Sequence, residues 1–237
     1  MTIHVKIITS GGERYDEEVL KIVVFDSCGE GEYFADKLES ELPVVEIIRV
    51  VDWRGAKRGI SPKDARKIAE QSLKPYIGRV DLIILANYLL TMTSLNYFRR
   101  KYKSQKFIGF ELSLKHTLSN NRKTLIIATK DITKSFEFFI SARRAKTKTV
   151  CTDDWSILTN GESAAGSIQK DLYKVSTKIG NFSPTQILLL CGQLARYAPE
   201  FRMVFGHNVR VVNGTDDAIK NTFRTLKIRG GTGKKSG

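Results

Sequence analysis

The stretch "KIVVFDSCGEGEYF", residues 21–34, decides the fold. Four consecutive apolar residues, 22–25, follow Lys21 and predict a buried strand. Asp26 and Ser27 follow this strand directly, and small residues and a segment with helical spacing come next. Because ligands of open α/β sheets bind beyond the carboxyl ends of the strands, the turn at Asp26 and Ser27 predicts one edge of a binding site.

The same alternation of strand and helix continues along the chain. Strands are expected at residues 21–25, 44–52, 80–87, 106–112, 123–129, 148–154 and 185–191, with one or two more within 202–213. Helices are expected at residues 31–42, 61–77, 93–102, 131–145, 164–179 and 215–226. Ser61 is the expected N-cap of the second helix, and Thr215 or Asp216 that of the last. Apolar strands separated by helices predict mostly parallel sheets covered on both faces, an α/β fold.

Polar or reactive side chains stand where six of the predicted strands stop. They are Asp26, Ser27, Asp52, Asn87, Thr129, Asp153, Asp154 and Cys191. One such residue has no special meaning, because every strand must end. Six strand ends in succession predict a lined cleft.

The composition bounds the class of protein. The chain has 237 residues, is 41% hydrophobic and carries a formal net charge of +14, which suits a globular protein that attracts anions. Binding to nucleic acid or to another acidic partner is therefore one hypothesis, although we find no RNA-recognition, KH or zinc-finger pattern. Three widely spaced cysteines and three histidines give no disulfide framework and no zinc spacing, so we expect neither metal nor cofactor.

The two ends of the chain carry little information on function. Residues 1–18 alternate like an edge strand or hairpin arm and lack the apolar stretch of a signal peptide. Residues 229–237 are rich in glycine and lysine and are expected to form a disordered basic tail. Since no apolar run approaches the about 20 residues of a membrane span, we expect a cytoplasmic protein without a membrane partner.

Five segments, in order, resemble the glutamate racemase family within the aspartate/glutamate racemase superfamily. "FDSCGEGE" (25–32) stands for the family's Asp-Ser-Gly-x-Gly-Gly turn, and "VVDWRGAKRG" (50–59) for a strand ending in Asp and a Pro-Tyr-Gly loop. "LIILANYL" (82–89) is similar to the strand before Cys-Asn-Thr, and "IIATKDITKS" (126–135) to an Ala-Thr-x-x-Thr turn. "ILLLCGQLARYAP" (187–199) resembles the strand that leads to Gly-Cys-Thr-His-Tyr-Pro.

The resemblance implies two similar α/β domains with mostly parallel sheets and a ligand cleft between them. The expected domains are residues 1–103 plus 206–228, and residues 104–205. It also implies a chemistry in which one thiolate removes the α-proton of glutamate and a second thiol, from the other domain, returns a proton to the opposite face. Relatives commonly form dimers, so the resemblance leaves a homodimer as one of the oligomeric states this chain could adopt.

This sequence departs from the family at the first cysteine position and around the second. Ala86 stands where the first cysteine is expected, and a methyl group cannot accept a proton. Tyr88 replaces the threonine that follows. Cys191 takes the second cysteine position if the register holds, with Gly192 and Gln193 in place of Thr-His. Two-cysteine racemisation is therefore not expected, and whether catalysis remains is open.

The candidate site follows from the residues that remain. Cys191 is the candidate catalytic residue; the candidate ligand-binding residues are Asp26, Ser27, Arg58, Gly59, Asn87 and Thr129. The preferred hypothesis is a divergent racemase-like protein that binds a small carboxylate, an amino acid or another anion in the cleft. An active racemase, or a one-thiol isomerase or decarboxylase that uses Cys191, is the alternative. A basic module that binds nucleic acid or an acidic partner is a further alternative.

Overall fold

The computed structural model describes residues 19–42, 45–56, 60–111, 122–134, 146–153, 155 and 165–228. The expected N-terminal arm, the basic tail, and the candidate residues Arg58 and Gly59 lie outside this part of the chain.

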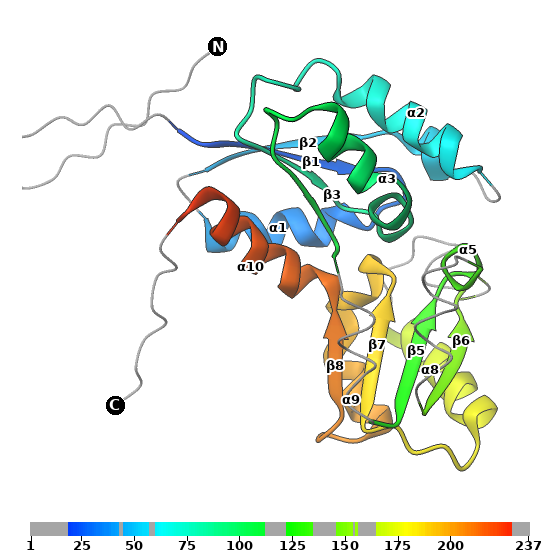
Figure 1. Cartoon of the computed structure of the whole chain (residues 1–237). Helices are drawn as coiled ribbons and strands as arrows, with labels where there is room; N and C mark the ends of the chain where they lie inside the picture. The colour runs from blue at the N-terminus through cyan, green and yellow to red at the C-terminus, as the bar shows by residue number, and fades with distance from the viewer. Residues whose placement is uncertain are drawn as a thin grey trace, which may run out of the picture.

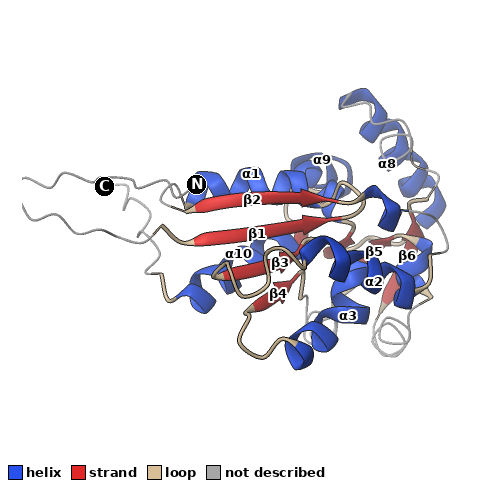
Figure 2. Ribbon diagram, turned by 90° about the horizontal axis from the view of Figure 1, so that it is seen from above, coloured by secondary structure: helices blue, strands red, loops and turns tan. Residues whose placement is uncertain are grey.

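The described residues form two four-stranded sheets, and every strand pair is parallel. The first sheet has the order β2-β1-β3-β4, which Figure 2 shows from above; its strands are β1 (Lys21–Asp26), β2 (Glu46–Val51), β3 (Leu82–Leu85) and β4 (Phe107–Gly109). The second sheet has the order β6-β5-β7-β8; its strands are β5 (Thr124–Ala128), β6 (Thr147–Cys151), β7 (Gln186–Leu190) and β8 (Arg210–Asn213). The α/β class with two parallel sheets is as predicted.

Helices cover the first sheet on both faces, as Figure 1 shows. One face carries α2 (Pro62–Leu73) and α3 (Tyr88–Lys101), and the other carries α1 (Gly31–Glu41) and α10 (Gly214–Leu226). The second sheet is accompanied by α5 (Lys130–Thr133), α8 (Ala165–Ile179) and α9 (Ala198–Phe205). Short 3-10 helices follow β2 and β7: η1 (Trp53–Ala56) and η2 (Gly192–Tyr197).

One apolar core joins the two sheets. Strand residues of the first sheet, such as Ile84, belong to the same buried cluster as Leu190 of the second. Ile219 of α10 also belongs to this cluster, and α10 runs from the end of β8 to lie beside α1 (Figure 1). The space between the halves is thus occupied by packed side chains, and burial of such apolar surface contributes about 25 cal/mol per Å².

The sheets divide the chain differently from the expected ranges. Strand β4 lies within the range 104–205 that was assigned to the second domain, but it pairs with β3 of the first sheet. Strand β8 lies within 206–228 of the first domain, but it pairs with β7 of the second sheet. Helix α10 follows β8 and returns to the first half, so the chain crosses over at residue 214.

The range 202–213, which is expected to carry one or two strands, carries one, β8, and residues 202–205 continue helix α9. One local prediction was wrong. The N-cap of α10 is Asn213, and not Thr215 or Asp216, since its side chain accepts hydrogen bonds from the backbone N–H groups of both. Ser61 is confirmed as the N-cap of α2. Residues 131–133 of the helix expected at 131–145 belong to helix α5, and residues 135–145 lie outside the described part of the chain.

Candidate functional site

The candidate site lies where the carboxyl ends of β1, β3 and β7 meet. The polar residues after β1 contact the start of α3, which follows β3, and the start of η2, which follows β7. The site is therefore built from both halves of the molecule.

Asp26 organises the turn after β1. Its Oδ1 accepts hydrogen bonds from the backbone N–H groups of Cys28, Gly29 and Glu30, at 2.9, 3.1 and 3.2 Å. Burial raises the pKa of Asp26, and these hydrogen bonds partly offset the rise. Gly29 takes a positive φ of 82°, which a residue with a side chain adopts only with strain. One oxygen of Asp26 is thus committed to the turn.

Glu30 is the residue that joins the two halves, and it was not among the predicted site residues. Its Oε2 accepts a hydrogen bond from the backbone N–H of Tyr88 at 3.0 Å, and its Oε1 accepts one from Gly192 at 3.1 Å. The residue is only 5% exposed. Burial raises its pKa to about 7, and the two backbone hydrogen bonds partly offset this rise. The sequence signal was an acid at a position where the racemase turn has glycine.

Both thiols near the site interact with Glu30. Cys191 follows β7 and is buried; Cys28 lies in the turn after β1. Burial raises the pKa of each thiol first, and the negative charge of Glu30 raises both further. The Cys28 Sγ also accepts a hydrogen bond from Asn87 Nδ2 at 2.9 Å. The thiols are therefore held in their protonated form, which is neither nucleophilic nor basic.

Asn87 and Ser27 lie on the first-half side of the cluster. Asn87 is the N-cap of α3, and its Oδ1 accepts the backbone N–H of Leu90 at 2.7 Å. Its Nδ2 also approaches Ser27 Oγ, at 3.4 Å. The structure thus brings four predicted residues, Asp26, Ser27, Asn87 and Cys191, to the same site.

Ala86 and Tyr88 fill the position expected for the first cysteine and its neighbour. Ala86 is fully buried, and a Cβ atom added to Gly31 would lie 3.0 Å from its methyl carbon. The Tyr88 hydroxyl donates to the carbonyl of Leu189 in β7 at 3.1 Å and accepts the backbone N–H of Gly214. Tyr88 therefore connects α3 to the second sheet through the space between the halves.

Gln193, in the second half of the molecule, contacts the turn after β1. Its Nε2 donates to the carbonyl oxygen of Cys28 at 2.5 Å. A Cβ atom on Gly29 would lie 2.7 Å from the same Nε2, so a side chain at this position would displace the Gln193 amide. The turn after β1 is thus held by η2 as well as by Asp26.

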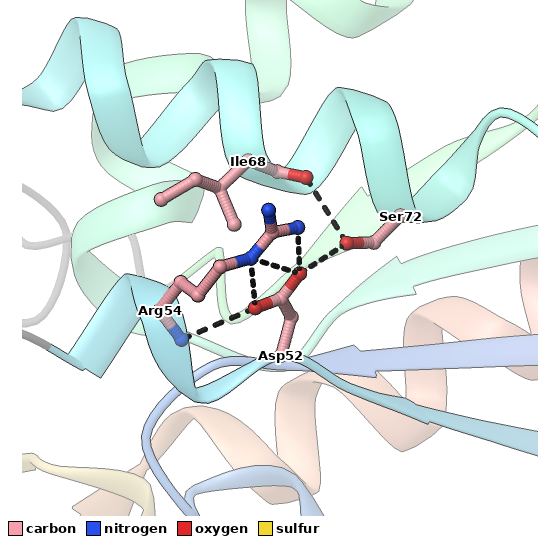
Figure 3. A network of polar contacts seen from close by, with 4 residues as sticks. All are labelled: Asp52, Arg54, Ile68 and Ser72. Atoms are coloured by element: carbon pink, nitrogen blue, oxygen red, sulfur yellow. Dashed lines mark hydrogen bonds and ion pairs between the residues drawn. The ribbon is translucent and has the colours of Figure 1, made fainter.

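Other strand-end residues do not join this cluster. Asp52 forms an ion pair with Arg54, at 2.6 Å, and accepts a hydrogen bond from Ser72 Oγ (Figure 3). Arg54 lowers the pKa of Asp52, and the hydrogen bond from Ser72 lowers it further. Asp153 accepts the backbone N–H of Lys130. Thr129 precedes α5, and its hydroxyl makes no hydrogen bond to the described residues of the cluster. Asp52 and Asp153 thus have partners of their own.

A cavity of about 290 Å³ opens beside the same turn. It is lined by the carboxyl-terminal parts of β1 and β2, the start of α1 and the indole of Trp53, with Asp26, Glu32 and Arg49 as its charged residues. Among the described residues, no three His, Cys, Asp or Glu side chains converge as metal ligands do. No helix in this part of the chain is long and apolar enough to cross a membrane.

No protein-family model matches the sequence, and no curated protein matches it significantly. Solved structures do match the fold. Glutamate racemase from Campylobacter jejuni superposes with a TM-score of 0.72 at 20% identity, over 91% of this chain and 89% of the racemase. Escherichia coli glutamate racemase, solved with L-glutamate and the activator UDP-MurNAc-Ala, gives 0.71 at 17% identity, over 92% and 86%.

Racemases with other substrates match as well. Aspartate racemase from Picrophilus torridus gives a TM-score of 0.60 at 15% identity, over 90% of this chain and 96% of that enzyme. Allantoin racemase from Klebsiella pneumoniae gives 0.57 at 15% identity, over 90% of both chains. The agreement covers nearly the whole length on both sides, and it includes both parallel sheets. The chain therefore has the two-domain α/β fold of these racemase structures.

Proposed function

We propose that this protein is a divergent, glutamate racemase-like protein that does not perform two-cysteine racemisation. The observation that carries the proposal is Ala86, which stands at the end of β3 where the resemblance expects the first thiol. Its methyl group is fully buried and can neither remove nor donate a proton. A carbon acid held there would have a thiol on one face only.

The neighbouring thiol of Cys28 does not supply the missing base. It contacts Asn87 Nδ2 from the turn after β1, and its pKa is raised by burial and by the charge of Glu30. A general base is most effective when its pKa lies near the working pH. Cys28 and Cys191 both have pKa values shifted away from that range.

The second part of the proposal is that a small carboxylate binds between the halves. It is supported by the backbone N–H groups of Tyr88 and Gly192, which converge on a carboxylate in this structure, that of Glu30. The ligand-binding roles of Asp26, Ser27 and Asn87 remain part of this proposal.

A one-thiol isomerase or decarboxylase is the second candidate. One observation favours it: the Cys191 thiol adjoins the buried Glu30 carboxyl, and its raised pKa keeps it protonated and therefore able to act as a proton donor. A single proton donor suffices for protonation of an enediolate, so Ala86 does not exclude this chemistry.

Exchange of the α-proton tests these proposals. Purified protein is incubated with D- or L-glutamate and, separately, aspartate in heavy water; proton NMR follows loss of the α-proton signal, and chiral chromatography follows inversion. We expect neither exchange nor inversion above a buffer control. Exchange that is lost in both Cys191→Ala and Cys28→Ala would establish a two-thiol racemase and refute the proposal. Exchange lost only in Cys191→Ala, without inversion, would support the one-thiol candidate.

A further inference from the structure

Glu30 makes contacts that its place in the sequence does not explain. It occupies the N-cap position of α1, where a side chain ordinarily accepts a hydrogen bond from its own helix. Its side chain makes no such bond. The carboxylate instead extends to Tyr88 and Gly192, which are 58 and 162 residues away. A local role in starting the helix is therefore not what holds it there.

The two partners of Glu30 are groups that need an acceptor. Tyr88 is the first residue of α3, so its N–H has no carbonyl partner within that helix. The N–H of Gly192 belongs to the residue that follows Cys191 at the end of β7. Each N–H binds a different oxygen of one carboxylate, at 3.0 and 3.1 Å. The arrangement therefore matches a carboxylate in shape as well as in charge.

The surroundings exclude water from this contact. Glu30 is 5% exposed, Tyr88 is 2% exposed, and a Cβ atom on Gly192 would lie 2.9 Å from the Glu30 Cβ. Hydrogen bonds to a buried charged group are stronger than those between neutral groups, and leaving such donors without an acceptor is destabilising. The site thus requires an occupant with two acceptor oxygens.

We propose that Glu30 is a tethered ligand: its carboxylate fills a carboxylate-binding site formed by the N–H groups of Tyr88 and Gly192. A free carboxylate enters this site only when the Glu30 side chain leaves it. The ligand class is a small monocarboxylate, or the carboxylate end of a larger molecule. This inference deepens the ligand-binding part of the proposed function, and it does not depend on the loss of racemisation.

Chemical rescue of Glu30→Ala by added carboxylate tests the inference. The variant removes the tethered carboxylate and leaves the two N–H groups without an acceptor. We expect its thermal midpoint to be lower than that of the native sequence, and to rise saturably with sodium formate or acetate. Sodium chloride at equal ionic strength is not expected to reproduce the rise. The acetate Kd of the variant should be at least about tenfold lower than that of the native protein, which is about 1.4 kcal/mol.

Glu41→Ala is the matched control. Glu41 ends the same helix, carries the same charge, is exposed and does not line the cavity beside Asp26. Its replacement should leave the thermal midpoint and the response to acetate unchanged. A Glu30→Ala protein that responds equally to acetate and chloride, or a Glu41→Ala protein that responds like Glu30→Ala, would overturn the inference.

A second measurement covers the case in which Glu30→Ala does not fold. In the native protein, the amide proton and nitrogen shifts of Tyr88 and Gly192 should change together as pH crosses about 7, the pKa of Glu30. In Glu30→Gln, which keeps the side-chain volume, this titration should disappear. Amide shifts that do not titrate in the native protein, or that titrate equally in Glu30→Gln, would contradict the inference. Exchange and inversion of the α-proton, lost in both cysteine variants, would refute the proposed function. That result would leave the inference about Glu30 unchanged, because the rescue and titration experiments do not measure racemisation.

Discussion

The carboxylate of Glu30, in the first half of the molecule, accepts the backbone N–H of Gly192, in the second half, at 3.1 Å. The same carboxylate accepts the N–H of Tyr88. A buried acid thus lies between the carboxyl ends of the two sheets, where the sequence predicted a cleft open to ligands. This contact makes the stability of the protein depend on a group that titrates near neutral pH.

Stability should fall as pH rises from about 4.5 to about 7. The pKa of Glu30 is about 7 in the folded protein and 4.5 in the unfolded chain, so the folded state binds more protons between these values. This difference is worth at most about 3 kcal/mol. The groups that face Glu30 are Asp26 from β1, Cys28 from the turn, Tyr88 from α3 and Cys191, which follows β7.

Urea denaturation at pH values from 4.5 to 8 measures this dependence. Because other groups also titrate, the informative quantity is the difference between the native protein and Glu30→Gln. We expect the native free energy of unfolding to decline with pH relative to that of Glu30→Gln. Parallel curves for the two proteins would contradict the prediction.

The fold was predictable because its signals are local. Unbroken apolar runs such as residues 22–25 predict strands that are buried on both faces. Ser61 and Pro62 mark the start of a helix because the cap and its partner Asp64 lie within four residues of each other. Within 202–213 the sequence left the number of strands open, since a short apolar run suits a buried helix as well as a strand, and residues 202–205 belong to helix α9. The pairing of β4 with β3 was not predictable in this way, because sheet membership is set by contacts between distant segments.

The candidate site was predictable only in part. Asp26, Ser27, Asn87 and Cys191 end strands, and parallel strands bring their carboxyl ends together. Glu30 could not be assigned its role, because its partners are distant in sequence and are backbone groups, which carry no residue signature.

Replacing Tyr88 by Phe should destabilise the protein by about 1–3 kcal/mol. The hydroxyl of Tyr88 accepts the N–H of Gly214 and donates to the carbonyl of Leu189, and the site is buried. Its removal leaves the Gly214 donor without this acceptor. Urea denaturation measures the loss, and Tyr173→Phe is the control, because Tyr173 is 67% exposed and its change should cost less than about 0.5 kcal/mol. Equal effects of the two substitutions would refute the interpretation.

Asp26→Ala should destabilise the protein by about 1–3 kcal/mol, whereas Asp26→Asn should cost less. Oδ1 of Asp26 accepts three backbone N–H groups, and an asparagine keeps an oxygen acceptor at this position. Denaturation of both variants at one pH separates the two cases. If Asp26→Asn were as unstable as Asp26→Ala, the charge and not the turn geometry would be the main contribution of this residue.

The Cys191 thiol should react slowly with iodoacetamide in the folded protein. It is 3% exposed, and burial and the charge of Glu30 both raise its pKa. Because each unit of pKa reduces the thiolate about tenfold, Cys191 should be alkylated more than tenfold more slowly than in urea-unfolded protein. Peptide mapping by mass spectrometry separates Cys191 from Cys28 and Cys151.

Glu30→Gln should then accelerate the alkylation of Cys191, because it removes the negative charge that opposes ionisation of the thiol. Loss of stability alone could also expose the thiol, so Tyr88→Phe serves as a destabilised control in which Glu30 is intact. Acceleration in Glu30→Gln beyond that in Tyr88→Phe identifies the electrostatic effect of Glu30. Equal acceleration in both variants would mean that opening of the structure, and not the charge of Glu30, limits the reactivity of Cys191.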